Sequence, residues 1–304
     1  MMGVIEKAGG SIHDIAAERN KKTDVSADEP QGFDLDYARF AETGLYHPDA
    51  KATQLALELR AVKRRLLRRI GFLRASGERQ AFRMPGRQRN LIMVTSARAG
   101  EGKTFSAANL ALSLALEDQI ETLLVDADVP RPKVCDRFGL RRAGPGLTDK
   151  LLDPSLAMRS LQYRANQAPL SILPEGAAVD RVSELFAKED CQRVFTELST
   201  EMQDRLVIID APPVLATTEA VILAKYVDEI VFVVEANATP EPAVASAIDE
   251  LLDINSNVSL MLNRCLIGSG GSHYGSYEFY GPSGEAESQT SQGARVEGDS
   301  NGAR

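Results

Sequence analysis

The stretch that most restricts the fold of this chain runs from Asn90 to Glu117. It begins with an apolar run, Leu91 to Val94, and continues through a loop of small residues. It ends in a segment that has Leu110 and Leu114 among alanines. This order predicts a buried strand, a loop and a helix.

The loop between this strand and this helix has the composition of a phosphate-binding loop. Gly100 and Gly102 allow successive backbone N–H groups to turn inward around an anion, and a helix N-terminus adds about half a positive charge. Lys103 is expected to reach the β- and γ-phosphates of a nucleotide, and the Thr104 hydroxyl to bind Mg²⁺. The usual motif opens with glycine, whereas this loop has Ala97. The alternative is an ordinary glycine turn, which the position between strand and helix disfavours.

Three aspartates stand at the ends of apolar segments. Asp126 and Asp128 end the segment that starts at Thr122, and Asp210 ends the segment that starts at Leu206. Ligands of open α/β sheets bind at the carboxyl ends of the strands, so these acids are expected beside the phosphate loop. There they would hold Mg²⁺ and its waters, and one would accept a proton from the attacking hydroxyl. Taken singly, each aspartate could instead be a helix cap.

Further apolar segments alternate with helical ones along the chain. Strands are expected at 170–174, 229–234 and 259–263, and helices at 216–225 and 242–252. This alternation predicts an α/β fold of the P-loop NTPase type, with a mostly parallel sheet and helices on both faces.

Composition divides the chain into four regions. After a short helical patch at 4–8, residues 1–50 are polar and acidic, and we expect a linker or a loosely held arm. Residues 51–89 are expected to form a basic amphipathic helical region that serves as a subunit interface. Residues 90–265 would form the P-loop domain, and 266–304 a disordered tail.

The basic region has eleven Lys and Arg residues between 60 and 89, against the single acid Glu78. Its apolar residues recur at spacings of three and four: Leu55, Leu59, Val62, Leu66, Ile70 and Leu73. The basic residues expected on the other faces of this helix are Arg60, Lys63, Arg64, Arg65, Arg68 and Arg69. The formal charge is −8 overall, so a contact with the acidic body of a neighbouring subunit is one interpretation. A nucleic acid, an anionic lipid, or a solvated helix packed on its own core are the others.

Membrane, zinc and disulfide classes are disfavoured by the sequence. No apolar run approaches the length of a membrane-spanning helix, and residues 1–10 lack the features of a signal peptide, so a soluble cytoplasmic protein is expected. Cys135, Cys191 and Cys265 are isolated from one another, which argues against a zinc site and against a disulfide framework.

The tail from Leu266 to Arg304 carries a tyrosine cluster at Tyr274, Tyr277 and Tyr280. A glycine-rich segment buries too little apolar area to build a core around these rings. Phenol hydroxyls on a flexible tether are good acceptors of a phosphoryl group, which predicts phosphorylation of these three residues. The alternative is an adhesive or merely disordered tail.

Taken together, these features resemble those of the bacterial tyrosine kinases, a family that is similar to the partition and division-site ATPases. The resemblance covers roughly residues 50–280 and lies in the phosphate loop, in Asp126-Ala127-Asp128, in Asp210-Ala211-Pro212-Pro213 and in the tyrosine cluster. Segments such as 217–220 look most like the autokinases encoded with exopolysaccharide and exosortase loci. The resemblance implies an ATP-dependent protein-tyrosine autokinase that phosphorylates its own tail and regulates exopolysaccharide synthesis or export.

The resemblance also implies roles for individual residues. The catalytic set would be Lys103, Asp126, Asp128 and Asp210. Asp126 would be the base or a metal-linked carboxylate with Asp128 as its partner, and Asp210 would hold a Mg²⁺-bound water. The metal would be held by Thr104, Asp126 and Asp210. The residues expected to contact ATP are Ala99, Gly100, Glu101, Gly102, Lys103, Thr104, Phe105 and, at the adenine, Asn263.

The partners implied by the resemblance are other protein chains. A ring-shaped homo-oligomer is expected, in which the tail of one subunit enters the site of its neighbour. A separate membrane-bound activator of the polysaccharide chain-length type and a phosphatase are also expected, and no nucleic acid. The protein would then be cytoplasmic and held at the inner face of the plasma membrane through its activator.

Some positions depart from the family pattern. Ala99 stands where proline is usual, Ala211 where serine or threonine is usual, and Pro130 where arginine is usual. The acid of the Glu-x2-Arg-x2-Arg element of the subunit interface is absent at Leu57, with Glu58 as its nearest substitute. These departures affect ring assembly more than phosphate binding.

Two other classes share part of this pattern. A partition or positioning ATPase would carry a second lysine early in the loop, where this chain has Ser96, Ala97 and Arg98. A nucleotide-binding regulator without catalysis would not need the three acids, all of which are present here.

Overall fold

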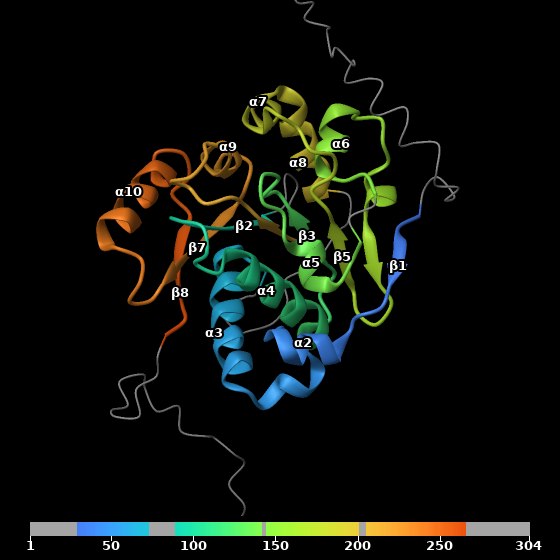
Figure 1. Cartoon of the computed structure of the whole chain (residues 1–304), viewed down its shortest axis with the longest axis vertical. Coiled ribbons are helices and arrows are strands. Elements are labelled where there is room, and N and C mark those ends of the chain that lie inside the picture. The colour runs from blue at the N-terminus through green and yellow to red at the C-terminus, as the bar shows by residue number, and fades with distance from the viewer. Residues whose placement is uncertain (1–28, 73–88, 142–143, 201–204, 266–304) are drawn as a thin grey trace, which may run out of the picture. The chain divides into compact units, whose positions relative to one another are not determined.

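The computed structural model describes residues 29–72, 89–141, 144–200 and 205–265 (Figure 1). The helical patch expected at 4–8, Leu73 and the three tyrosines of the tail lie outside these described residues. In the described part, the helices and short 3-10 turns are α2 (Tyr37–Thr43), η1 (Pro48–Ala52), α3 (Gln54–Arg69), α4 (Lys103–Asp118), α5 (Val134–Phe138), α6 (Leu147–Leu152), η2 (Met158–Leu161), α7 (Val182–Ala187), α8 (Glu189–Thr200), α9 (Glu219–Ala224) and α10 (Glu241–Leu252).

Eight strands in the described part form one sheet with the order β1-β4-β5-β3-β6-β2-β7-β8. They are β1 (Gln31–Phe33), β2 (Leu91–Ser96), β3 (Thr122–Asp126), β4 (Tyr163–Ala165), β5 (Leu170–Leu173), β6 (Leu206–Asp210), β7 (Glu229–Glu235) and β8 (Val258–Asn263). All neighbouring pairs are parallel except β4 and β5, which are antiparallel. The predicted α/β fold with a mostly parallel sheet is therefore confirmed.

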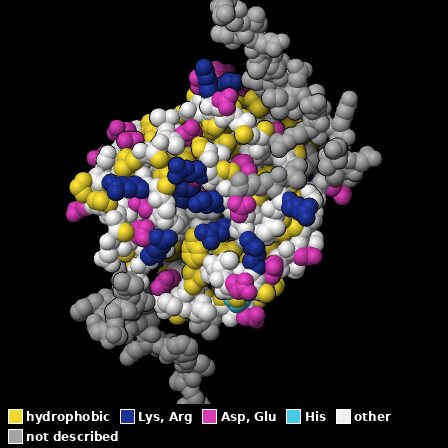
Figure 2. Space-filling model, in the orientation of Figure 1, with side chains coloured by type: hydrophobic (Ala, Val, Ile, Leu, Met, Phe, Trp, Pro, Cys, Tyr) yellow, Lys and Arg dark blue, Asp and Glu magenta, His cyan; other side chains and the backbone are white. Residues whose placement is uncertain are grey.

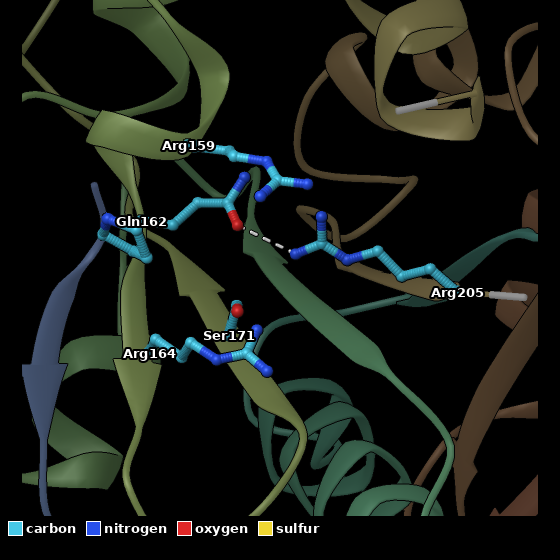
Figure 3. Close-up of a pocket in the computed structure, with 6 residues that line it drawn as sticks. Arg159, Gln162, Arg164, Ser171 and Arg205 are labelled. Carbon is cyan, nitrogen blue, oxygen red and sulfur yellow. Dashed lines mark hydrogen bonds between the residues drawn. The ribbon is translucent and has the colours of Figure 1, made fainter. Parts of the chain in front are cut away.

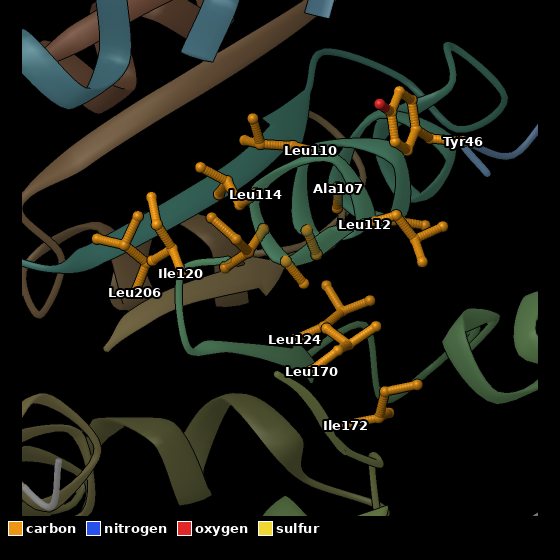
Figure 4. Packing of buried hydrophobic residues seen from close by; sticks show 14 of the residues in the cluster. Tyr46, Ala107, Leu110, Leu112, Leu114, Ile120, Leu124, Leu170, Ile172 and Leu206 are labelled. Atoms are coloured by element: carbon orange, nitrogen blue, oxygen red, sulfur yellow. The ribbon is translucent and has the colours of Figure 1, made fainter. Parts of the chain in front are cut away.

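Alternate residues of the central strands pack into two separate hydrophobic cores, one on each face of the sheet. Ile92, Leu124 and Ile208 point to the face covered by α2, α3, α4 and α5, where α4 supplies most of the packing surface (Figure 4). Leu123 and Val207 point to the opposite face, which is covered by α6 to α10. Burial on both faces explains why these strands read as continuous apolar runs.

The described part of the expected N-terminal arm is packed onto the domain. Residues 31–33 form β1 at one edge of the sheet, and the side chains of Phe40, Leu45 and Tyr46 are fully buried against the α4 face. Asn109 of α4 fixes this segment, because its side-chain oxygen accepts the Tyr46 backbone N–H at 2.7 Å. The expectation of a loosely held arm is thus wrong for residues 29–50. The sequence does not reveal this packing, because β1 and α2 are too short for their apolar residues to show a periodic pattern.

Helix α3 begins at Gln54, and the expected apolar stripe buries Leu59, Leu66 and Ile70. The basic residues are less uniformly exposed than we expected. Lys63 is only 3 % exposed, and its ammonium group donates to Glu117 Oε2 at 2.9 Å and to Asp118 Oδ2 at 2.6 Å, both on α4. Part of the basic charge of α3 is therefore neutralised within the chain.

Other basic residues of α3 divide into two groups. Arg60 pairs with Glu117, and Arg69 donates to Glu229 of β7 at 2.7 Å. Arg64, Arg65 and Arg68 are exposed. On the face shown in Figure 2, basic and acidic side chains are interspersed rather than separated.

A small polar pocket lies at the amino ends of β3 and β6, the sheet edge opposite the phosphate loop (Figure 3). It is lined by Pro30, Arg159, Gln162, Arg164, Ser171 and Arg205. Arg205 donates to Gln162 Oε1 at 2.8 Å, and Arg164 donates to Glu121 Oε1 at 2.7 Å, so these guanidinium groups stabilise the local structure. None of the helices in the described part combines the length and hydropathy that crossing a bilayer requires.

Candidate nucleotide-binding and catalytic site

The loop from Ala97 to Gly102 connects the carboxyl end of β2 to the first residue of α4, Lys103. Gly100 and Gly102 have φ values of +94° and +97°, which residues with a side chain adopt only at a cost. Gly102 is the N-cap of α4, and the first helical hydrogen bond of that turn joins Ser106 N to Gly102 O at 2.9 Å. The earlier amides of the helix have no partner within it and can bind an anion.

Lys103 lies between two carboxylates at the carboxyl ends of the central strands. Its ammonium group is 2.5 Å from Asp128 Oδ2 and 3.7 Å from Asp210 Oδ1, and the residue is only 7 % exposed. Burial alone would lower the pKa of Lys103, but Asp210 and Asp128 outweigh it and raise the pKa. The lysine is therefore cationic at neutral pH, as phosphate binding requires.

Asp210 is the least satisfied group of this site. It is completely buried, and among the described residues neither of its carboxylate oxygens has a donor at regular hydrogen-bond geometry, although the Lys103 ammonium and the Thr104 hydroxyl are near enough to lower its pKa. Burial raises its pKa to about 6, although Lys103 acts in the opposite direction. A buried carboxylate without regular hydrogen bonds costs stability, so this position is suited to a ligand that supplies the missing charge or hydrogen bond.

Asp126 pairs with Asp210 across β3 and β6, which places both acids side by side at one sheet edge. Unlike Asp210, Asp126 is bound to backbone: its Oδ2 accepts from Lys133 N at 3.0 Å and from Val134 N at 2.9 Å. Its Oδ1 accepts from Asp128 N at 3.2 Å. Burial, followed by the charge of Asp210, nevertheless raises its pKa well above the usual range. A carboxyl group with a raised pKa is suited to receive a proton near neutral pH.

These residues fit a nucleotide with Mg²⁺. The carboxylate oxygens of Asp210 and the hydroxyl of Thr104, 5 % exposed at the start of α4, are oxygen ligands of the type that Mg²⁺ or its waters take. Within the described residues, no three His, Cys, Asp or Glu side chains converge on one metal position.

Two residues that were expected to contact ATP, Phe105 and Glu101, have side chains that make contacts within the protein. Phe105 packs against the core on the α4 face, and its ring centroid is 6.0 Å from the Arg137 guanidinium carbon. Glu101 is only 4 % exposed, and its carboxylate accepts the Arg98 backbone N–H at 2.9 Å and the Thr239 hydroxyl at 2.7 Å. For both residues, the backbone N–H is the group left to meet a phosphate.

Asn263 lies at the end of β8, directly against the phosphate loop. Its side-chain amide donates to the Glu101 carbonyl at 2.8 Å. A Cβ atom at Gly102 would lie 2.0 Å from the same nitrogen. The structure therefore brings Asn263 to the loop, whereas its expected adenine contact stays a prediction.

Sequence reasoning overlooked Thr239 and Glu175. Thr239 lies between β7 and α10 in a segment without a motif, so only the structure reveals its bond to Glu101. Glu175 follows β5 and is near enough to Asp126 to contribute to its raised pKa. An acid that directly follows an apolar strand is the signal that could have identified Glu175.

Comparison with known proteins places this site in a family. No family model matches the chain. Tyrosine-protein kinase YwqD of Bacillus subtilis is 32% identical over 200 residues, which are 66% of this chain and 81% of that protein. Tyrosine-protein kinase ptk of Acinetobacter johnsonii is 31% identical over 145 residues, or 48% of this chain, and the match spans only 19% of that longer protein.

Solved structures agree with the sequence relatives. The VpsO kinase domain is 34% identical with a TM-score of 0.54, and the match covers 59% of this chain and 86% of that domain. The kinase domain of the Escherichia coli tyrosine kinase ETK has a TM-score of 0.60 at 21% identity over 81% of this chain and 92% of that one. A chain of the MinC:MinD cell division protein complex of Aquifex aeolicus matches with a TM-score of 0.50 at 20% identity. This match covers 58% of this chain and 69% of that one and shows a shared fold. With the site geometry and the coverage of YwqD, these matches show that the chain belongs to the bacterial tyrosine kinase family.

Proposed function

We propose that this protein is an ATP- and Mg²⁺-dependent protein-tyrosine autokinase that phosphorylates Tyr274, Tyr277 and Tyr280 and thereby regulates exopolysaccharide synthesis or export. The observation that carries the proposal is the position of Lys103 between Asp128 and the fully buried carboxylate of Asp210, at the start of α4. Such a site binds a phosphate chain and a metal, and family membership supports tyrosine as the acceptor.

Each residue of the site would have a defined task. The γ-phosphoryl group of ATP would pass to the tyrosine oxygen, and the bond to the β-phosphate oxygen would break to release ADP. Thr104 and Asp210 would hold Mg²⁺ and its water. Lys103 would exchange Asp128 for the phosphates, and the amides of the loop would bind their oxygens. Asp126 would accept the proton of the tyrosine hydroxyl, since burial raises its pKa and so makes it a stronger base.

The proposed assembly follows the family. The protein would form a homo-oligomer, in which exposed Arg64, Arg65 and Arg68 of α3 could meet the acidic surface of a neighbour. It would be activated by a separate membrane-bound protein, reversed by a phosphatase, and located in the cytoplasm at the membrane.

The test is phosphorylation of the purified chain with ATP and Mg²⁺, followed by mass spectrometry of the tail. We expect phosphate on one or more of Tyr274, Tyr277 and Tyr280, and none after replacement of all three by phenylalanine. Mixing a Lys103→Met acceptor with an active subunit that lacks the three tyrosines reports transfer between molecules. Phosphotyrosine that persists in Lys103→Met, or an unmodified tail in the active protein, would contradict the proposal.

A further inference from the structure

The phosphate loop is held from one side by three residues, Glu101, Thr239 and Asn263, whose mutual hydrogen bonds no motif predicts. We infer that Glu101, Thr239 and Asn263 form a clamp that sets the loop in its phosphate-receiving conformation and joins it to the root of the tyrosine tail. The inference rests on the proposed function for the role of the tail, but its first part concerns phosphate binding alone.

The first half of the clamp is the Glu101 carboxylate. A negative charge within a phosphate-binding loop would repel a triphosphate if it faced the ligand. Here both oxygens are occupied: one accepts the Arg98 N–H within the loop, and the other accepts the Thr239 hydroxyl from the segment between β7 and α10. Thr239 is itself oriented, because its hydroxyl accepts the Glu235 backbone N–H at 3.1 Å. The Glu101 carboxylate therefore links the phosphate loop to the segment between β7 and α10.

The second half of the clamp is Asn263. Its side-chain amide donates to the Glu101 backbone carbonyl at 2.8 Å, and its backbone carbonyl accepts the Ala236 N–H at 2.9 Å. One residue thus bridges the phosphate loop and the segment that carries Thr239. The approach to Gly102 is so close that a side chain there would collide with the Asn263 amide.

The clamp is continuous with the origin of the tail. Arg264 follows Asn263 and donates to Glu235 Oε1 at 2.6 Å, so the last described residues are fixed to the same segment. Cys265 comes next, and the tail begins at Leu266. A change in the phosphate loop on ligand binding would therefore be transmitted through Asn263 to Arg264 and Cys265, the last described residues before the tail.

The three clamp residues would act by holding the loop in place, so the test must distinguish this role from a contact with the adenine base of ATP. Binding of Mg·ATP and of Mg²⁺ with inorganic tripolyphosphate, which has no base, is measured by calorimetry on the full chain. We expect Thr239→Val and Asn263→Ala to weaken both ligands by the same factor, about three- to tenfold. Thr239→Ser should restore binding because it retains the hydroxyl. A loss confined to ATP, or no loss in either variant, would overturn the clamp.

A matched control excludes a general effect of removing a hydroxyl. Thr196→Val removes an exposed hydroxyl of α8 that donates to the Gln192 carbonyl at 2.8 Å. Its affinities for both ligands should equal those of the unmodified chain. Hydrogen exchange gives a structural readout: the Arg98 amide should exchange faster in Thr239→Val but not in Thr196→Val. Equal exchange at Arg98 in both variants would contradict a clamp that acts through Glu101.

The link to the tail is tested with the thiol of Cys265, which is exposed while Cys135 and Cys191 are buried. Its rate of reaction with a thiol reagent should change when Mg²⁺ and tripolyphosphate bind, and Asn263→Ala should abolish that change. An identical ligand effect in Asn263→Ala would remove the coupling. None of these measurements requires catalysis. Their failure would contradict the clamp, whereas an absence of tail phosphorylation would contradict the proposed function.

Discussion

Two buried lysines on the α4 side of the molecule have similar partners but different surroundings. Lys63 on α3 donates to Glu117, Asp118 and the Ser113 carbonyl. The two carboxylates of this seam between α3 and α4 are partly exposed to solvent. Lys103 on α4 also has two carboxylate neighbours, but Asp210 lies fully buried beyond hydrogen-bonding distance.

The pKa values of Glu117, beside Lys63, and of Asp210, beside Lys103, shift in opposite directions. Burial would raise the pKa of Glu117, but hydrogen bonds from Lys63 and Arg60 prevail and lower it. For Asp210, burial prevails over Lys103, and the pKa rises to about 6. A lowered pKa shows that favourable partners outweigh burial, as at Glu117, whereas a raised one shows that burial outweighs the partners, as at Asp210.

The largest expected effect separates the two lysines by activity. Lys103→Met should lower the initial rate of tail phosphorylation by at least about 100-fold, because the charge that binds the phosphates is lost. Lys63→Met should leave the dissociation constant for ATP within about twofold but lower the free energy of unfolding by about 2 kcal/mol, since the ion pairs of a buried ammonium group with Glu117 and Asp118 are lost. Kinetics, calorimetry and urea unfolding measure these values. Comparable loss of ATP binding in both variants would break the comparison.

The next effect concerns Asp210 in the ligand-free protein. Asp210→Asn should raise the free energy of unfolding by about 1 to 3 kcal/mol at pH 7.5 in EDTA, because it removes a buried charge without regular hydrogen bonds. A group whose folded pKa is raised binds more protons in the folded state, so the cost of Asp210 grows as pH rises from 3.8 to about 6. The gain should therefore disappear near pH 4. A variant that is less stable than the unmodified chain at pH 7.5 would show that Asp210 is structural.

The smallest effect has the opposite pH dependence. Glu117→Gln should lower the free energy of unfolding at pH 7 by about 1 kcal/mol, because it weakens the bonds to Lys63 and Arg60. Since the folded pKa of Glu117 is lowered, this contribution is present above its ordinary value of 4.5 and is lost as pH falls through the lowered pKa. Urea unfolding at several pH values measures it. A difference that grows on acidification would reverse our assignment of the seam.

The sequence predicted the central strands and the position of the acids well, for a physical reason. Strands buried on both faces must be apolar throughout, so an aspartate at the end of such a run stands out, as Asp126 and Asp210 do. The phosphate loop was equally visible, because its glycines and Lys103 follow a fixed local spacing.

What was missed depends on contacts between distant parts of the chain. Tyr46 is held by Asn109, and Thr239 by Glu101, over separations that no local pattern encodes. Lys63 was expected among the basic residues outside the apolar stripe of the helix, because the sequence does not show that Glu117 and Asp118 would lie opposite it. Strands β1 and β4 have three residues each, too few to show alternation.

The pairing of Asp126 with Asp210 limits how the length of this chain can vary. Side chains of a strand alternate between faces, so one residue deleted within β6 would carry the carboxylate of position 210 to the side covered by α8. An extra residue in a connecting loop changes no such alternation. Lineages of this protein should therefore tolerate insertions between the strands and exclude them from the few positions that precede the two acids.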